Sequence, residues 1–235
     1  MTLHALRTVA SRPPLHLHRF LSHVQASAAL TATVVADLDD AIRRREAASL
    51  AVPGGTTPGA FLGLLGQRLL DWRRVFVTLT DERWVAPDQD RSNAGLVART
   101  LGQAGRPYAW FPLWRQGLTP SQALPLLESQ SDTLPWPLDV VVLGMGDDGH
   151  VASLFPGDET GFSTAAGQRF VAVAGPGDEP RISLSAEALA AARNVYLLLR
   201  GATKEKVLTE ALASDLPVAR LFAARNGAVT VYSSS

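Results

Sequence analysis

The sequence has no cysteine among its 235 residues. Disulfide-stapled scaffolds, cysteine nucleophiles and thiolate-ligated zinc or iron–sulfur sites are therefore excluded. Net charge is absent too, because 22 basic and 22 acidic residues cancel at pH 7. A neutral chain has no bulk electrostatic attraction to nucleic acid or to an anionic membrane. No apolar stretch is long enough to span a bilayer, so we expect neither nucleic acid nor a membrane as a partner.

The start of the chain is poor in acids, since no Asp or Glu precedes Asp37. Such a start is typical of an organelle transit peptide. The pattern from residue 15 onward favours a structural role instead. Residues 15–20 alternate as a strand does, and residues 21–42 repeat every three or four positions as a helix does. We expect a single domain over residues 1–235, with a ragged N-terminus over residues 1–14.

Short apolar, β-branched runs alternate with helical patterns along the rest of the chain. The runs predict strands over residues 49–52, 75–80, 138–143, 170–174, 195–199 and 228–232. The helical patterns cover residues 21–46, 58–70, 92–101, 120–131, 185–192 and 202–213. Most of the predicted strands are continuously apolar, which is typical of strands buried on both faces. This alternation predicts an α/β fold with a mostly parallel sheet.

Polar and glycine-rich segments follow several of these strands. In a parallel sheet, ligands bind beyond the carboxyl ends of the strands. We therefore expect one site that combines the segments after four of the predicted strands. These segments are Pro53–Pro58, Asp81–Trp84, Gly144–His150 and Arg200–Lys204.

The segment Gly54–Thr57 has the features of a phosphate site. Its glycines let backbone N–H groups approach a ligand, and Pro58 suits the first turn of a helix whose N-terminus favours an anion. It is not a Walker loop, because no Gly-Lys-Ser/Thr follows. A tight turn with a threonine cap is the alternative. Lys204 is one of only two lysines, and its compact ammonium at the same edge suits a phosphate counter-charge.

His150 is the only histidine beyond the first 23 residues. It follows a buried strand in a glycine-rich turn, where Asp147 or Asp148 is near enough to orient its ring, and this favours a general base. The stretch Gly144–Gly149 matches the dinucleotide pattern G-x-G-x-x-G, but its two aspartates would repel a pyrophosphate. Because no second histidine is near, we expect no metal, and because the dinucleotide match is weak, we expect no dinucleotide cofactor.

Six stretches of the chain carry a resemblance to a known family. The most specific is Leu143–Gly157, which reads LGMGDDGHVASLFPG. The others are PGGTTPG (53–59), TDERWV (80–85), RSNAG (91–95), RISLS (181–185) and GATKEKVL (201–208). In this order and spacing the chain resembles the 6-phosphogluconolactonase family from about residue 15 to the C-terminus.

The resemblance implies a Rossmann-like three-layer domain, similar to that of glucosamine-6-phosphate deaminase. It implies a cytoplasmic hydrolase that converts 6-phospho-D-glucono-1,5-lactone to 6-phosphogluconate in the oxidative pentose phosphate pathway. We expect this enzyme to be a monomer whose partner is the phosphosugar lactone. His150 corresponds to the family's catalytic base, and Asp148 to its partner. The implied substrate-binding residues are Gly54, Gly55, Thr56 and Thr57 with Lys204 and Arg181 at the 6-phosphate, and Asp81, Arg83 and Asn93 along the sugar pocket.

Two other functions stay open at this stage. An amino-sugar phosphate isomerase-deaminase shares the glycine–threonine loop and Asp-Gly-His. Its motif continues after the histidine with an Asn-Glu pair, where this chain has Ser153–Pro156. A non-catalytic sugar-phosphate sensor would carry a helix-turn-helix ahead of its sensor domain, and residues 1–48 have no room for one. The chain departs from the lactonase pattern at Pro53, which removes a hydroxyl and an N–H near the phosphate, and at Val151.

Overall fold

The computed structural model describes residues 14–234 and contains a seven-stranded parallel sheet. Its strands are β1 (Leu15–Phe20), β2 (Ala48–Val52), β3 (Val75–Leu79), β5 (Ala109–Trp110), β6 (Val140–Leu143), β9 (Asn194–Arg200) and β10 (Val229–Ser234). They lie in the order β1-β10-β9-β6-β2-β3-β5, and every neighbouring pair is parallel. The predicted α/β fold with a mostly parallel sheet is confirmed. The ragged start and the transit peptide concern mainly residues 1–13, which lie outside the described part.

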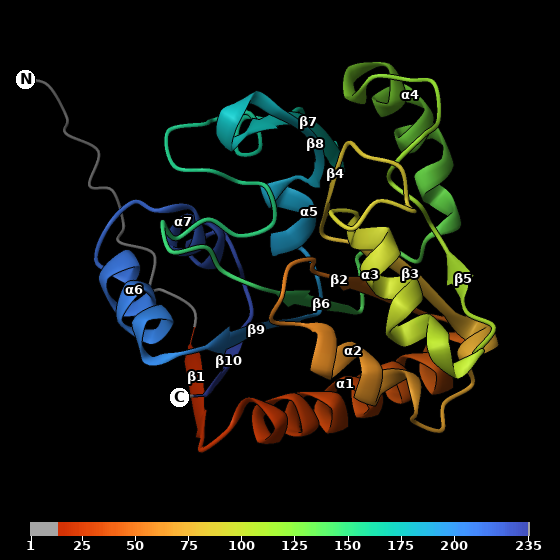
Figure 1. The fold of residues 1–235 in the computed structure, drawn as a ribbon, viewed down its shortest axis with the longest axis vertical. Coiled ribbons are helices and arrows are strands. Elements are labelled where there is room, and N and C mark those ends of the chain that lie inside the picture. The colour runs from red at the N-terminus through yellow and green to blue at the C-terminus, as the bar shows by residue number, and fades with distance from the viewer. Residues whose placement is uncertain (1–13, 235) are drawn as a thin grey trace, which may run out of the picture.

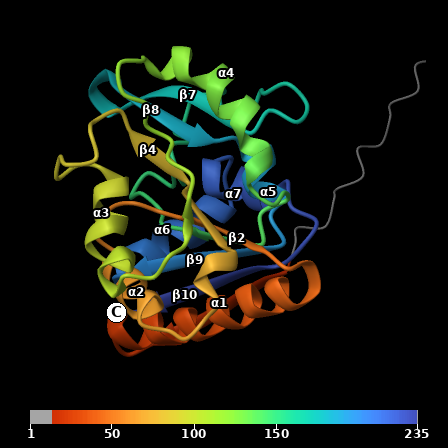
Figure 2. The ribbon, with the colours of Figure 1, turned by 90° about the vertical axis from the view of Figure 1, so that its right-hand side faces the viewer.

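Helices cover both faces of this sheet and complete the three layers (Figure 1). They are α1 (His23–Arg45), α2 (Gly59–Gly66), α3 (Asn93–Arg99), α4 (Pro120–Gln130), α5 (Ala186–Ala190), α6 (Ala202–Leu212) and α7 (Pro217–Ala223). Short 3₁₀ segments occupy Trp72–Arg74, Leu101–Ala104, Ser131–Thr133 and Pro176–Asp178. Helix α1 runs along one face of the sheet, and α6 and α7 lie on the other (Figure 2). Within residues 14–234, no helix has the length and apolar character needed to cross a membrane.

Helix α1 has clear start and stop signals in its sequence. The Ser22 hydroxyl accepts a hydrogen bond from the Gln25 N–H at 3.3 Å, and Arg43–Arg45 complement the negative end of the helix dipole. Glu46 adopts a left-handed conformation with φ 64°, which ends the helix. Between these ends, a buried stripe recurs every three or four positions and packs on the sheet. Its apolar members are Ala26, Leu30, Val34, Leu38 and Ala41.

A second, antiparallel sheet is absent from the sequence prediction. It consists of β4 (Asp81–Arg83), β8 (Glu179–Leu184) and β7 (Phe170–Gly175), in that order. The predicted strand over residues 170–174 exists, but it pairs with β8 and does not belong to the parallel sheet. An apolar run is compatible with either kind of sheet, so the sequence pattern could not assign its partner. Helix α4 packs against this small sheet, on the side away from α1 (Figure 2).

Strand β3 connects the two sheets. Only Thr80 separates β3 from β4, so Asp81 lies at the carboxyl edge of the parallel sheet and also begins the small sheet. The Thr80 N–H donates to the Val52 carbonyl at 3.0 Å, and the Thr80 carbonyl accepts from the Leu184 N–H at 2.8 Å. These bonds hold the small sheet against the edge at which the loops after the parallel strands meet.

Candidate active site

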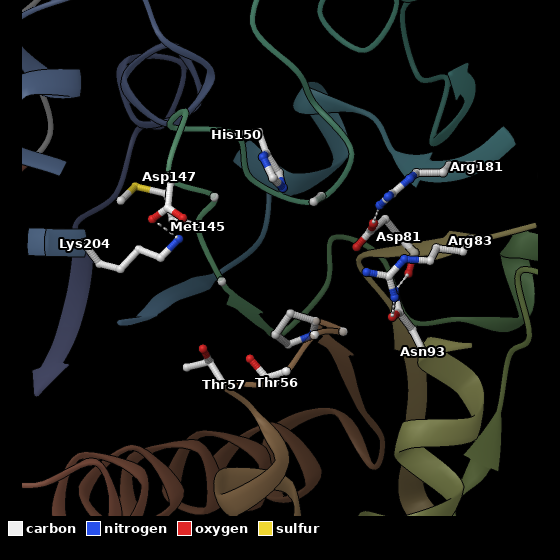
Figure 3. Close-up of a pocket in the computed structure, with 16 residues that line it drawn as sticks. Thr56, Thr57, Asp81, Arg83, Asn93, Met145, Asp147, His150, Arg181 and Lys204 are labelled. Carbon is white, nitrogen blue, oxygen red and sulfur yellow. Dashed lines mark hydrogen bonds and ion pairs between the residues drawn. The ribbon is translucent and has the colours of Figure 1, made fainter. Parts of the chain in front are cut away.

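A pocket of about 380 Å³ opens at the carboxyl edge of the parallel sheet (Figure 3). It is lined by Pro53, Gly54, Gly55, Thr56, Thr57, Asp81, Arg83, Asn93, Gly144, Met145, Gly146, Asp147, His150, Ala152, Arg181 and Lys204. Every predicted site residue except Asp148 belongs to this lining, and Asp148 contacts the His150 ring from beside it. The loops therefore meet at one edge of the sheet, as the sequence predicted.

The pocket has two sides of different origin. Loops after β2, β6 and β9 form the strand-end wall, which consists of Gly54–Thr57, Gly146–His150 and Lys204. The small sheet forms the small-sheet wall: Asp81 and Arg83 on β4 and Arg181 on β8 line the pocket, and Glu179 on β8 pairs with the two arginines without lining it. Figure 3 shows Lys204 on the opposite side of the pocket from Arg83 and Arg181. A ligand that fills the pocket meets a cation on each side.

The glycine–threonine loop Gly54–Thr57 leads from β2 into α2 and packs tightly against its surroundings. A Cβ at Gly54 would lie only 1.8 Å from Asn93 Oδ1, so no side chain fits there. At the other end of the loop, the Thr57 carbonyl oxygen lies 2.8 Å from His23 Nε2 on α1. No side chain caps the start of α2, so the threonine cap of the alternative interpretation is absent. The loop is held at both ends while its residues line the pocket.

His150 lies in a tight turn directly after β6. Its ring Nδ1 is 2.6 Å from Asp148 Oδ1, and the same carboxylate oxygen accepts the His150 backbone N–H at 3.2 Å. The imidazole packs against Phe155, with ring centroids 4.9 Å apart. A Cβ on Gly146 would lie 2.1 Å from His150 Nδ1, so this glycine makes room for the ring. The turn, the carboxylate and the aromatic ring together hold the imidazole at the pocket.

Asp148 decides which ring nitrogen of His150 carries the proton. Partial burial would raise the pKa of the Asp148 carboxyl. The hydrogen bonds from the His150 backbone and ring, and the charge interaction with that ring, bring the pKa below its ordinary value. Asp148 is therefore a carboxylate at neutral pH and accepts the Nδ1 proton of the ring. This leaves Nε2 as the unprotonated nitrogen of a neutral imidazole, which is the form that can take up a proton.

Lys204, in the first turn of α6, is the cation of the strand-end wall. Its Nζ lies 2.8 Å from Asp147 Oδ1. The Lys204 side chain is 23% exposed, whereas that of Asp147 is 80% exposed. The consecutive acids Asp147 and Asp148 thus have different partners, one at each side of the same turn.

The charges of the small-sheet wall are more buried and share their partners. Asp81 is 6% exposed and accepts hydrogen bonds from Thr80 Oγ1 at 3.2 Å and from Ser153 Oγ at 2.6 Å. Arg181 Nη1 lies 3.7 Å from Asp81 Oδ2, and Arg181 Nη2 donates to Glu179 Oε2 at 2.7 Å. The carboxylate of Asp81 is therefore hydrogen-bonded and ion-paired to neighbouring side chains of the protein.

Glu179 is a structural partner of the pocket arginines that the sequence did not reveal, because no motif includes it. Three arginines share its carboxylate. Besides Arg181, it pairs with Arg91, and Arg83 Nε lies 3.8 Å from Oε2. Arg83 Nη1 also donates to the Arg91 carbonyl at 2.8 Å and to Asn93 Oδ1 at 3.3 Å. Glu179 thus keeps the two pocket arginines close together although their charges repel.

Asn93 is placed in the pocket by Glu82. The Glu82 carboxylate is fully buried and accepts hydrogen bonds from the backbone N–H groups of Asn93 and Ala94, both at 2.8 Å. Burial raises the pKa of Glu82, while these hydrogen bonds act in the opposite direction. The Asn93 amide in turn donates to the Asp81 carbonyl at 2.8 Å. Glu82 supports the site from behind the lining.

The geometry also bears on metal and dinucleotide binding. Among residues 14–234, no group of three or more His, Cys, Asp or Glu side chains is arranged to hold a metal ion. Residues 144–149 form a loop and a turn, so the G-x-G-x-x-G match lacks the helix that a dinucleotide site needs. The other lining residues belong to the same motifs as the predicted site residues, although the sequence prediction assigned them no contact with the substrate. They are Pro53, Gly144, Met145, Gly146, Asp147 and Ala152.

Comparisons with known proteins place the chain in a family. The model of a family described as glucosamine-6-phosphate isomerases/6-phosphogluconolactonase matches residues 22–231. A curated 6-phosphogluconolactonase of Rhizobium meliloti is 42% identical over 205 residues, which cover 85% of this chain and 88% of that protein. A 6-phosphogluconolactonase of Pseudomonas aeruginosa is 38% identical over 200 residues, which cover 83% of this chain and 84% of that protein.

The solved structures agree with these sequence matches. The crystal structure of a 6-phosphogluconolactonase from Shewanella baltica has a TM-score of 0.87 at 33% identity, and the match covers 96% of this chain and 99% of that chain. The expected Rossmann-like fold is confirmed by this similarity. The matches of sequence and fold extend over both walls of the pocket. The chain belongs to the glucosamine-6-phosphate isomerase/6-phosphogluconolactonase family.

Proposed function

We propose that this protein hydrolyses 6-phospho-D-glucono-1,5-lactone to 6-phosphogluconate. The observation that carries the proposal is the His150–Asp148 pair, whose imidazole lines the same pocket as the glycine–threonine loop and Lys204. A phosphorylated lactone requires a base and an anion site in one pocket. Family membership supplies the reaction, because the curated relatives are named 6-phosphogluconolactonases.

In this proposal the strand-end wall binds the phosphate of the substrate. Backbone N–H groups of Gly54–Thr57 at the start of α2 and the threonine hydroxyls donate hydrogen bonds, and Lys204 contributes its charge. The family resemblance assigns Arg181 to the phosphate as well. Because Arg181 lies across the pocket from Lys204 (Figure 3), we assign it with Arg83 to the lactone end of the substrate.

The chemical step needs one base and a stabilised oxyanion. Nε2 of neutral His150 removes a proton from water while the water oxygen attacks C1 of the lactone, a contribution of about 10²–10⁴-fold. Negative charge develops on the carbonyl oxygen, where Arg83, Arg181 or backbone N–H groups of the 146–150 turn stabilise it. The bond between C1 and the ring oxygen then breaks, and the imidazolium returns the proton to that oxygen. The resulting carboxylic acid ionises in water.

The anchored phosphate explains how a single base can suffice. A lactone is an activated ester that already reacts slowly with water. Binding the phosphate at the glycine–threonine loop and Lys204 orients C1 toward His150 and lowers the entropic cost of the attack. The small-sheet wall supports this assignment, because the guanidinium groups of Arg83 and Arg181 are held in place by Asp81 and Glu179 and provide fixed N–H donors at the lactone end.

The test is lactone hydrolysis by the wild type and by His150→Ala. The lactone is generated in situ, and 6-phosphogluconate is measured above the spontaneous rate. We expect wild-type acceleration and a loss of about 10²–10⁴-fold in kcat for His150→Ala, with a much smaller change in KM. The matched control is His16→Ala, which removes an exposed histidine on β1 and keeps full activity. Full kcat in His150→Ala would contradict the mechanism.

The same experiment separates the competing function. If the wild type does not accelerate lactone hydrolysis, release of ammonia from glucosamine 6-phosphate becomes the next assay. Ser153 stands in the segment where the deaminase motif has its acid, and its hydroxyl is bonded to Asp81. A monomeric state and a cytoplasmic location stay predictions, which sedimentation and localisation of a tagged chain would test.

A further inference from the structure

The ion pair between Asp147 and Lys204 is not explained by the reaction above. Asp147 Oδ1 lies 2.8 Å from Lys204 Nζ, and both side chains line the pocket. The other lysine, Lys206, has an ordinary surface partner in Glu210 at 3.7 Å on the same helix. The lysine that we assign to the substrate phosphate thus has a carboxylate partner within the protein itself.

Asp147 cannot share the role of Asp148. Within the turn, the Gly146 N–H donates to the His150 carbonyl at 2.9 Å, and the Gly149 N–H donates to the Gly146 carbonyl at 3.2 Å. This tight turn sends the two consecutive carboxylates to different partners. Asp148 reaches the His150 ring, while Asp147 reaches Lys204, which Figure 3 shows on the far side of the turn.

We propose that Asp147 is an internal counterion that competes with the substrate phosphate for Lys204 and so sets the affinity of the pocket for phosphorylated ligands. This inference rests on the proposed function, because it takes Lys204 as the phosphate ligand. A phosphate that contacts Lys204 competes with the Asp147 carboxylate for the ammonium, because two anions held against one Nζ repel each other. Asp147 is 80% exposed, so it can turn into water without unfolding the turn.

The positions of the cations in the pocket suggest that this competition assists product release. Hydrolysis converts a ligand with one anionic group into a product with two, a phosphate and a carboxylate. Lys204 lies on one side of the pocket, and Arg83 and Arg181 lie on the other, so the product matches a cation at each end (Figure 3). Such a pocket would hold its product tightly. A carboxylate that returns to Lys204 weakens phosphate binding and speeds release of the product.

The opposite role for Asp147 is to hold Lys204 in position for the phosphate. The two roles differ in sign. A competing counterion predicts that removal of the carboxylate tightens phosphate binding, whereas a positioning partner predicts that removal weakens it. Binding measured without turnover therefore distinguishes them.

The experiment is calorimetric titration of 6-phosphogluconate and of inorganic phosphate into the wild type and Asp147→Asn. We expect Asp147→Asn to bind both ligands about twofold to fivefold more tightly, with a lower KM and an unchanged or lower kcat, because the phosphate no longer competes with an anion for Lys204. Asp147→Ala should show the same direction. Unchanged or weaker binding in these variants would overturn the proposal.

Two controls sharpen this result. Asp71→Asn removes an equally charged acid from an exposed ion pair with Arg74, ahead of β3 at the opposite edge of the sheet, and should leave the affinity unchanged. In a Lys204→Gln background, which keeps a hydrogen-bond donor, Asp147→Asn should change the affinity less than twofold. Equal tightening in that background would mean general repulsion rather than competition for Lys204, and would overturn the proposal.

Failure of the proposed function gives a different result. If the wild type neither hydrolyses the lactone nor binds 6-phosphogluconate, both the proposed function and this inference are overturned. If the wild type does both and Asp147→Asn does not bind more tightly, only the inference about Asp147 is overturned.

Discussion

The two walls of the pocket hold their charges in different ways. On the strand-end wall, each charged group has a single, partly exposed partner: His150 pairs with Asp148, and Lys204 pairs with Asp147. On the small-sheet wall, Asp81 and Glu179 are largely buried and share several donors. Simple exposed pairs can exchange partners, whereas a buried network resists it.

This difference suits the two tasks of the proposed reaction. A base must gain and lose a proton, and a phosphate site must bind its ligand and release it. Both therefore need ion-pair partners that can be exchanged during the reaction. Stabilising an oxyanion instead needs charges that are already in place when the transition state forms. Four predictions test whether the walls divide the work in this way.

The largest of these four effects is expected where Gly54 of the strand-end wall contacts Asn93, which is hydrogen-bonded to Asp81 and Arg83 of the small-sheet wall. Gly54→Ala would place a methyl group 1.8 Å from Asn93 Oδ1, so either the loop or Asn93 must move. Misplacement of about 1 Å costs about 10²-fold, and we expect kcat/KM to fall at least this far while the protein stays folded. Steady-state kinetics and thermal unfolding measure the two effects.

The matched control for this change lies in the following helix. A Cβ at Gly63 meets no atom within 4 Å, so Gly63→Ala should keep full activity. It should also raise stability by about 0.5–1 kcal/mol, because alanine favours the helix interior. If Gly54→Ala were as active as Gly63→Ala, the close contact between the walls would have no functional role.

Asp148→Asn tests the orienting pair of the strand-end wall. An amide can donate to Nδ1 of His150 and would favour the tautomer that carries the proton on Nε2, which cannot act as a base. The equivalent change in a serine protease triad costs about 10⁴-fold in kcat. Because Asp148 is half exposed and the ring can relax, we expect a smaller loss of about 10–10²-fold in kcat, with little change in KM. An unchanged kcat would show that Asp148 does not orient the base.

Lys204→Ala tests the phosphate end of the same wall. Loss of a charged hydrogen-bond donor costs about 1.5–3 kcal/mol, so KM should rise by about 10–10²-fold while kcat changes less. Lys206→Ala is the matched control, because Lys206 is two residues further along α6 and its side chain is 76% exposed. Kinetics with the lactone measure both variants. A fall in kcat with unchanged KM would remove Lys204 from the phosphate site.

Glu179→Gln, which tests the small-sheet wall, is expected to have the smallest effect of the four. Arg83 and Arg181 would lose their shared carboxylate, and their repulsion would spread them apart. At about 0.5–1.5 kcal/mol for a hydrogen bond, kcat should fall by about twofold to tenfold, with KM nearly unchanged. Glu210→Gln, a change on the surface of α6, should have no effect. A rise in KM alone would place the arginines at the phosphate and break the division between the walls.

Much of the strand-end wall could be predicted from the sequence because it is local. Each of its groups lies within a few residues of a strand end, and strand ends are visible as the limits of apolar runs. The predicted positions of Gly54–Thr57, His150 and Lys204 in one pocket followed from a single rule about parallel sheets. Asp148 lies two residues from His150, so its contact with the ring was predictable as well.

The sequence by itself determined the alternation of strands and helices, the loops that meet at the carboxyl edge and the pairing of His150 with Asp148. The family resemblance named Asp81, Arg83 and Arg181, but only the tertiary structure decided how the small-sheet wall is built and that Glu179 belongs to it. Glu179 lies far along the chain from Arg83 and Arg91, and β4 and β8 become neighbours only when the whole chain is folded. An apolar run indicates that a segment is buried, but it does not indicate which strand the segment pairs with. Burial follows from the composition of the segment, whereas strand pairing depends on contacts between segments that are distant in the sequence.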